Sequence, residues 1–210
     1  VDFEHYQISR DQSRKRFEES AEIILKAWTQ DKVSHHGALW QMDDVEVYPR
    51  PVQKPHPPLW VAGGSPESLG WAGRHGAGIM TVAHPYPPEK LTAGMAAWRQ
   101  GLKDGGHDPE SAHCKIHVRV WVDESSEKAR ETAEAAIIRY DDLMMKGRVA
   151  RNGVPPDQYN WEGMKAMGRN VYGNPDECIR CIQNTMEHYD FDIFSATFNF
   201  GGLPHTDVMR

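Results

Sequence analysis

Apolar and polar positions follow two different periods along this chain. Near the N-terminus, apolar residues recur at spacings of four, three and four residues, which predicts an amphipathic helix over residues 9–29. Further on, short apolar runs are each followed by a turn, a capping residue and a helical pattern. The predicted strands lie at 59–62, 78–83, 115–122 and 192–200, and the predicted helices begin at Ser65, Pro87, Ser126 and Asn174. Strands that alternate with helices favour parallel pairing with right-handed crossovers.

Two stretches lack this alternation of predicted strands and helices. Residues 31–57 contain four closely spaced prolines, and Pro58 follows directly. This spacing predicts a loop of extended chain, in which His35 and His36 are expected to be exposed to solvent. Residues 146–172 are rich in glycine, proline and arginine, and a stretch of this length in a compact domain predicts a mobile lid over the site.

The strand at 115–122 predicts the architecture. One face is apolar and the other is mainly polar, with Lys115, His117, Arg119 and Trp121 on the second face. A doubly wound sheet packs helices on both faces and needs both to be apolar, whereas a barrel tolerates a polar interior around a site. Such a barrel needs eight strands and roughly 250 residues. We therefore predict an α/β fold that is the C-terminal half of a (β/α)8 TIM barrel, as one partial domain over 1–210.

Half a barrel leaves open sheet edges and uncovered apolar side chains. We expect exposed core residues around Ile79, Val118 and Phe198. The chain is therefore expected to pair with the missing barrel half or with a homo- or hetero-oligomeric partner.

Composition narrows the class of protein. The 210 residues include 24 Lys+Arg and 30 Asp+Glu, and this mildly acidic balance argues against nucleic acid as a partner. No apolar run approaches the ~18 residues of a membrane helix. The three cysteines and the absence of a signal peptide at the N-terminus fit a cytoplasmic protein.

The turn after the first predicted strand is a candidate anion site. Gly63 and Gly64 allow a phosphate to approach the backbone, and the helix that follows offers free N–H groups together with the hydroxyls of Ser65 and Ser68. The alternative is that Ser65 only caps its helix.

Two further motifs contain residues that could carry chemistry. His84 follows the second strand and would lie at the C-terminal mouth of a barrel, although a simple loop histidine fits as well. Cys178 and Cys181 form a CxxC pair inside a predicted helix, where packing is a better interpretation than metal binding or redox chemistry.

Residues 49–65, Pro-Arg-Pro-Val-Gln-Lys-Pro-His-Pro-Pro-Leu-Trp-Val-Ala-Gly-Gly-Ser, carry a family resemblance. They are similar to the proline-rich run into the fifth strand of the bacterial luciferase-like flavin monooxygenases. The stretches at 173–179 and 201–204 support the same resemblance. It implies a (β/α)8 barrel that uses reduced FMN, or a deazaflavin coenzyme in one branch, with the Gly63-Gly64-Ser65 turn at the FMN phosphate.

The resemblance also implies residue roles. Lys115-Ile116-His117-Val118 resembles an Arg-Ile-His-Val strand whose basic residues line the active site of alkanesulfonate-type members, with a lysine here in place of the arginine. His117 is then a candidate proton donor or acid/base, and Arg119 a candidate stabiliser of an anionic flavin or substrate. His84 is a candidate cofactor contact on separate grounds, because its position places it at the barrel mouth.

The predicted function is an FMN-dependent monooxygenase that receives reduced flavin from a separate reductase and oxygenates a small organic substrate. Three alternatives remain: a deazaflavin-dependent oxidoreductase, a non-catalytic flavin-binding protein, and a metal-dependent barrel hydrolase that uses His84 and His117.

Overall fold

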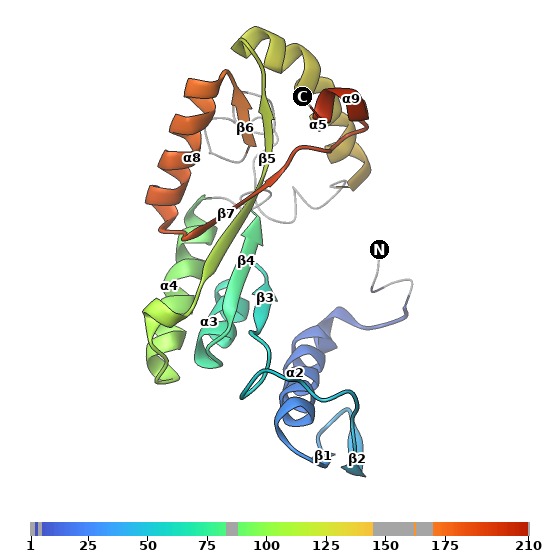
Figure 1. Cartoon of the computed structure of the whole chain (residues 1–210). Helices are drawn as coiled ribbons and strands as arrows, with labels where there is room; N and C mark the ends of the chain where they lie inside the picture. Colours follow the sequence, from blue (N-terminus) through green and yellow to red (C-terminus); the bar gives the residue numbers. More distant parts are fainter. Residues whose placement is uncertain (1–2, 4–5, 83–87, 145–161, 163–169, 210) are drawn as a thin grey trace. The chain divides into compact units, whose positions relative to one another are not determined.

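The computed structural model describes residues 3, 6–82, 88–144, 162 and 170–209, which form two compact units, residues 1–58 and residues 59–210 (Figure 1). His84 lies outside the described residues, as does all of the expected lid except residues 162 and 170–172. No helix in the described ranges is both long enough and apolar enough to cross a membrane.

The first unit is a helix followed by a small hairpin. A 3-10 turn, η1 (Arg10–Gln12), leads into α2 (Ser13–Thr29), which confirms the predicted helix. Strands β1 (Val33–His36) and β2 (Gln41–Val45) then pair antiparallel. The sequence analysis missed this hairpin because its strands are mostly polar and only their ends carry valine.

A single carboxylate links the hairpin to the helix. Glu19 of α2 accepts hydrogen bonds from the backbone N–H groups of Leu39 (3.0 Å) and Trp40 (2.8 Å), and lies 3.1 Å from Nε2 of His35. His35 is only 5 % exposed, so the expectation that it faces solvent is wrong, because Glu19 gives its buried ring a polar partner. The neighbouring His36 is exposed, as expected.

The second unit alternates strands with helices. Its elements are β3 (Trp60–Ala62), α3 (Pro66–Arg74), β4 (Gly78–Val82), α4 (Pro88–Asp104), η2 (Pro109–Ser111), β5 (Cys114–Val122), α5 (Ser126–Met144), β6 (Asn170–Gly173), α8 (Pro175–Tyr189), β7 (Ile193–Thr197) and α9 (His205–Val208). Every strand pair in this unit is parallel. The predicted α/β class is therefore confirmed. The sequence analysis missed β6 because it is short and falls within the stretch assigned to a lid.

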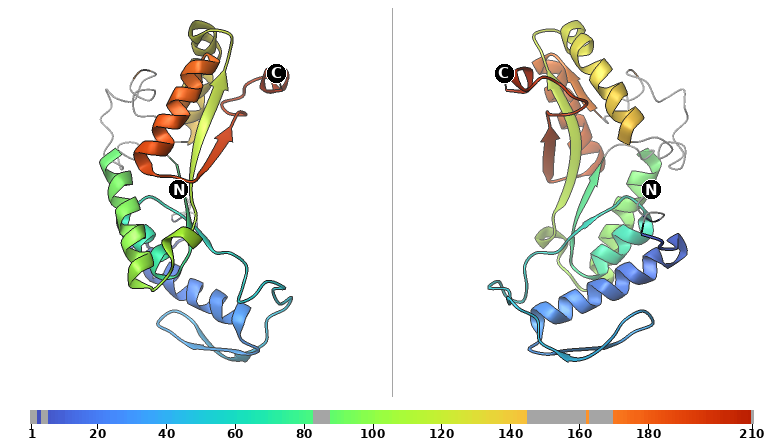
Figure 2. Two further views of the ribbon diagram at one scale, coloured as in Figure 1. Left: turned by 60° about the vertical axis from the view of Figure 1, so that its left-hand side comes forward. Right: turned by 90° about the vertical axis from the view of Figure 1, so that its right-hand side faces the viewer.

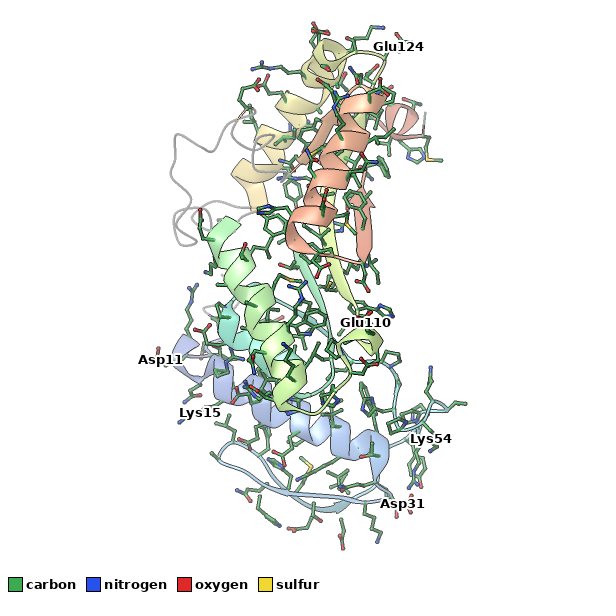
Figure 3. All side chains as sticks on the ribbon, turned by 90° about the vertical axis from the view of Figure 1, so that its left-hand side faces the viewer. Asp11, Lys15, Asp31, Lys54, Glu110 and Glu124 are labelled. Carbon is green, nitrogen blue, oxygen red and sulfur yellow. The ribbon has the colours of Figure 1, made fainter. Side chains whose placement is uncertain are left out.

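Strand β5 is central to the sheet, and Glu110 and Glu124 in Figure 3 mark the chain just before and just after it. Residues 115–117 pair with both β4 and β7, and Arg119 pairs with both β6 and β7. Because a strand has two edges, β4 and β6 share one edge of β5, and β7 occupies the other.

The two faces of this sheet differ as the sequence predicted. The face with Ile116 and Val118 is buried, and Ile79 of β4 lies on the same face with no exposed surface. The expectation that core residues around Ile79 and Val118 would be exposed is therefore wrong, because helices cover this face; Phe198 is 46 % exposed, as expected. The apolar side chains that do reach solvent from β3 and β4 lie on the opposite face: Trp60, Met80 and Val82.

The start of β7 is anchored to the start of β5. The carboxylate of Asp192 accepts a hydrogen bond from the backbone N–H of Cys114 (2.7 Å) and lies 2.5 Å from Nδ1 of His113. Arg99 of α4 donates to the Asp190 carboxylate at 2.6 Å in the turn before β7. These contacts fix the register of β7 on β5.

Helices α3 and α4 touch through glycines. A Cβ added to Gly73 would lie 2.2 Å from the carbonyl oxygen of Trp98, and one added to Gly101 would lie 2.4 Å from that of Gly70. The two backbones therefore approach so closely that no side chain fits between them.

Gly73→Ala is expected to lower the free energy of unfolding by about 1–3 kcal/mol, because the new methyl group meets backbone atoms that cannot move aside. Gly70→Ala on the same helix is the matched control: its Cβ meets its nearest neighbour at 3.5 Å, and better helix propensity favours alanine. Urea unfolding of both variants measures the difference. Equal stability of the two variants would refute the close contact.

Glu19→Gln is expected to loosen the hairpin. Burial raises the pKa of Glu19, but hydrogen bonds from Trp40, Leu39 and His35 outweigh it and hold this pKa below its ordinary value. A carboxylate whose pKa is lowered by folding stabilises the folded state above the unfolded-state pKa. This stabilisation is lost as the pH falls through the folded-state pKa.

The Glu19→Gln variant should therefore show faster amide hydrogen exchange at Leu39 and Trp40 at pH 7, and its difference from the wild type should shrink below a pH of about 4. Glu18→Gln, at the adjacent half-buried position, is the control and should leave both amides unchanged. A difference between variant and wild type that does not vary with pH would contradict the role of the charge.

Candidate functional site

The polar face of β5 gathers side chains from three strands. Lys115, His117 and Arg119 project from this face at alternate positions, as predicted. The parallel register places Ser195 of β7 beside His117, and it places both Thr197 of β7 and Asn170 of β6 beside Arg119. The fold thus builds a cluster that the sequence alone shows only in its β5 part.

The His117 ring lies between two hydroxyls. Its Nδ1 is 3.1 Å from Oγ of Ser195, and its Nε2 is 2.8 Å from Oγ1 of Thr197. Burial lowers the pKa of His117, and the positive charges of Lys115 and Arg119 lower it further. Because an unperturbed histidine titrates near pH 6.5, this imidazole is neutral at pH 7.

The guanidinium of Arg119 is held in place from two directions. Its Nε donates to Oδ1 of Asn170 at 3.0 Å, and its Cζ lies 5.0 Å from the ring centroid of Tyr140 on α5. Arg119 is 8 % exposed and Asn170 is fully buried. The site therefore holds a largely desolvated positive charge with a defined orientation, which is what an anionic ligand group requires.

An apolar cluster closes the end of this face that follows Arg119. Trp121 shares the face of Arg119 and packs with residues of α5, β6 and the chain after β7: Ala129, Ala133, Ala136, Ile137, Tyr172, Phe200 and Leu203. Figure 2 shows α5 and α8 on different sides of β5 and β6. Helix α5 therefore lies on the side of the sheet that carries the polar cluster.

The β3–α3 turn has the geometry of a helix cap. Oγ of Ser65 accepts a hydrogen bond from the backbone N–H of Ser68 (3.3 Å) and lies 3.1 Å from the Ser68 hydroxyl. Within the described part of the chain, the backbone N–H groups of Gly64 and Ser65 have no acceptor. The cap and an anion site are compatible. The cap uses the N–H of Ser68, whereas a phosphate would use the N–H groups of Gly64 and Ser65.

The turn and the polar cluster lie in the same sheet. Ala62, which ends β3, is in register with Met80 of β4, and Met80 is in register with Lys115 of β5. Two strand spacings, about 10 Å, therefore separate the end of β3 from Lys115 in the cluster. This distance fits opposite ends of one elongated cofactor. The predicted site residues thus form two groups. One group, at the β3–α3 turn, contains Gly63, Gly64, Ser65 and Ser68, and the other, on β5, contains His117 and Arg119.

The cysteines lie apart from this site. Burial raises the pKa of the Cys114 thiol to about 11, so it stays protonated and is a poor nucleophile. The thiols of Cys178 and Cys181 face backbone carbonyl oxygens, that of Trp121 for Cys178 and that of Asn170 for Cys181. Among the described residues, no three histidine, cysteine or acidic side chains are grouped to hold a metal ion.

The sequence analysis did not single out Ser195, Thr197, Asn170 or Tyr140. Ser195 and Thr197 have period-two spacing within the last predicted strand, which is the signal that could have placed them on one face. Asn170 carried no such signal, because β6 was not predicted.

Comparisons with known proteins identify relatives of this chain. The family model described as luciferase-like monooxygenase matches residues 1–182. The FMNH2-dependent dimethylsulfone monooxygenase of Pseudomonas putida is 24 % identical over 159 residues, which cover 73 % of this chain and 42 % of the relative. The F420-dependent glucose-6-phosphate dehydrogenase of Amycolatopsis mediterranei is 28 % identical over 116 residues, or 55 % of this chain and 34 % of the relative. The chain spans less than half the length of either relative.

A solved structure matches the fold. The crystal structure of the monooxygenase RslO1 from Streptomyces bottropensis superposes with a TM-score of 0.84 and 24 % sequence identity, covering 99 % of this chain and 60 % of that protein. This similarity confirms the relation to the TIM-barrel fold that the alternation in β5 predicted. The family match extends over most of the sequence and includes the β3–α3 turn and all of β5, so this chain belongs to the luciferase-like monooxygenase family.

Proposed function

We propose that this protein is an FMN-dependent monooxygenase that uses reduced flavin and molecular oxygen to place one oxygen atom on a small organic substrate. The observation that carries the proposal is the neutral, half-buried His117 beside the buried guanidinium of Arg119. A flavin enzyme that handles oxygen needs a proton-exchanging group and a fixed positive charge next to the reacting atoms, in a place of limited water access.

The cofactor contacts follow from the β3–α3 turn. The N–H groups of Gly64 and Ser65, the dipole of α3 and the hydroxyls of Ser65 and Ser68 would hold the FMN phosphate. Gly63 has no side chain that would block the approach of the phosphate to the backbone. His84, which lies outside the described residues, would be a further contact of the cofactor. When bound, the reduced flavin supplies the electrons that activate oxygen.

The residues of β5 have distinct roles. Arg119 cannot swing away from the site, because Asn170 and Tyr140 hold it, so its charge would stabilise an anionic group of the flavin or substrate. His117 would exchange a proton with the ligand, and its neutral state allows this at pH 7.

Two partners are part of the proposal. A separate reductase would deliver reduced FMN. A relative from Acinetobacter baylyi that is 25 % identical over 127 residues is named as the oxygenase component of a flavin-dependent trigonelline monooxygenase, and this name supports a second component for that protein. Among the described strands, β3, β6 and β7 each pair on one edge only, and Trp60, Met80 and Val82 leave apolar surface exposed on β3 and β4. Further barrel strands, from the same polypeptide or from another subunit, would complete the site.

A deazaflavin-dependent oxidoreductase is the second candidate. The relative from Amycolatopsis mediterranei supports it, since its identity to this chain is slightly higher. We favour FMN because the match to the FMNH2-dependent relative extends over a larger share of this chain.

Ser65→Asp is expected to weaken binding of reduced FMN by about 1–3 kcal/mol, because the carboxylate would face the phosphate. Aspartate is as good an N-cap as serine, so the helix should remain intact. Anaerobic titration in the full-length protein measures the loss, with Ser111→Asp on exposed η2 as the control. Unchanged affinity in Ser65→Asp would remove this turn from the cofactor site.

Oxygen uptake distinguishes the candidate functions. With reduced FMN and a panel of small organic substrates, product should form with consumption of oxygen. His117→Gln should lower kcat by about 10²–10⁴-fold while FMN affinity stays unchanged. Reduction of a deazaflavin without oxygen uptake would favour the second candidate. Flavin binding with neither reaction would indicate a non-catalytic flavin protein.

A further inference from the structure

The two hydroxyls on either side of His117 carry an inference beyond the assignment of the site. Ser195 and Thr197 belong to the same strand, two residues apart, and both side chains lie on the face of β7 that meets His117. One contacts each ring nitrogen. The ring therefore has a partner at both nitrogens, and any rotation or flip breaks both contacts.

Hydrogen-bond accounting restricts the arrangement. A neutral imidazole has one N–H donor and one acceptor nitrogen, whereas a hydroxyl can donate or accept. One of the two hydroxyls must therefore donate to the ring and the other must accept from it. Hydroxyl donors make shorter hydrogen bonds than N–H donors. The Thr197 contact is 2.8 Å and the Ser195 contact is 3.1 Å, and the shorter contact favours Thr197 as the donor.

We propose that Ser195 and Thr197 are positioning residues that hold His117 in one tautomer, with the Nδ1 proton donated to Ser195 and Nε2 accepting from the Thr197 hydroxyl. Two other features keep β7 in this position. The Asp192 carboxylate fixes the start of the strand on β5, and Arg99 fixes the turn before it.

The surroundings keep the ring neutral. Among the described residues, the charged groups that lower the pKa of His117 are Lys115 and Arg119, both on its own strand. The neighbouring strand β7 contributes only hydroxyls at this level, and the residue of β4 in register with His117 is Val82. Neither neighbour offers a carboxylate to stabilise an imidazolium.

The arrangement defines the ligand group that meets Thr197. Because its proton points to His117, the Thr197 oxygen presents only lone pairs to the interior of the site. A ligand group at this position must therefore be a hydrogen-bond donor, such as an N–H or O–H. The importance of this positioning for catalysis rests on the proposed function, whereas the tautomer of His117 does not depend on it.

Nuclear magnetic resonance of the full-length protein with ¹⁵N-labelled histidine tests the proposal. The His117→Gln spectrum assigns the ring signals. We expect a protonated Nδ1 and an unprotonated Nε2 at pH 7, and the same pattern at pH 6.5, where an unperturbed histidine is about half protonated. A protonated Nε2, or rapid averaging between the tautomers, would overturn the assignment.

Thr197→Val removes the donor without a change in shape, and should turn the single tautomer into a mixture in which the Nδ1-protonated form falls several-fold. Thr197→Ser should restore the wild-type signals, and Ser195→Ala should also give a mixture. Thr81→Val is the matched control, because this threonine lies on the buried, opposite face of β4 and its hydroxyl has no partner in the described structure.

Wild-type signals in Thr197→Val would refute the positioning role. If that variant does not fold, Thr197→Ser and Ser195→Ala still decide the question. Failure of this inference is distinguishable from failure of the proposed function: a single tautomer without oxygen uptake counts against only the function, and oxygen uptake with averaged tautomers counts against only the inference.

Discussion

The pairing of β5 with strands on both of its edges is the constraint on which the second unit depends. Nine residues of one strand set the register of β4, β6 and β7, so each side chain of β5 meets a defined neighbour. Since side chains alternate between faces, the same pairing places an apolar row under the helices and a polar row on the other side. Any shift of register by one residue would exchange the two rows.

The site owes its chemistry to this geometry. Three basic side chains lie at alternate positions of one strand, and burial together with the two flanking cations lowers the pKa of the central His117. Hydroxyls from β7 and an amide from β6 provide hydrogen bonds without adding charge. The cluster can therefore keep a neutral histidine next to a permanent cation.

The first unit uses a polar link for a purely structural purpose. The Glu19 carboxylate gathers two backbone N–H groups and a buried histidine, and these contacts hold a hairpin whose own strands have little apolar surface. Charge-assisted hydrogen bonds of this kind are stronger than neutral ones. They explain how a polar hairpin forms in a stretch that sequence patterns assign to a loop.

The sequence by itself determined the elements whose signal is local. Helix caps, the glycine turn and the period-two alternation of β5 each act within a few residues, so α3, α8, β5 and the faces of β5 could be predicted. The family resemblance came from such a local run. Only the tertiary structure decided which strands meet β5 and at which residues.

Contacts between residues far apart in the chain leave no local pattern. His117 and Ser195 are 78 residues apart, and Arg119 and Asn170 are 51 residues apart, so nothing in either segment alone indicates the other. The burial of His35 by Glu19 has the same cause. The chemistry-bearing residue types could be read from the sequence, whereas their hydrogen-bond partners, and with them the protonation state of His117, depend on strand register.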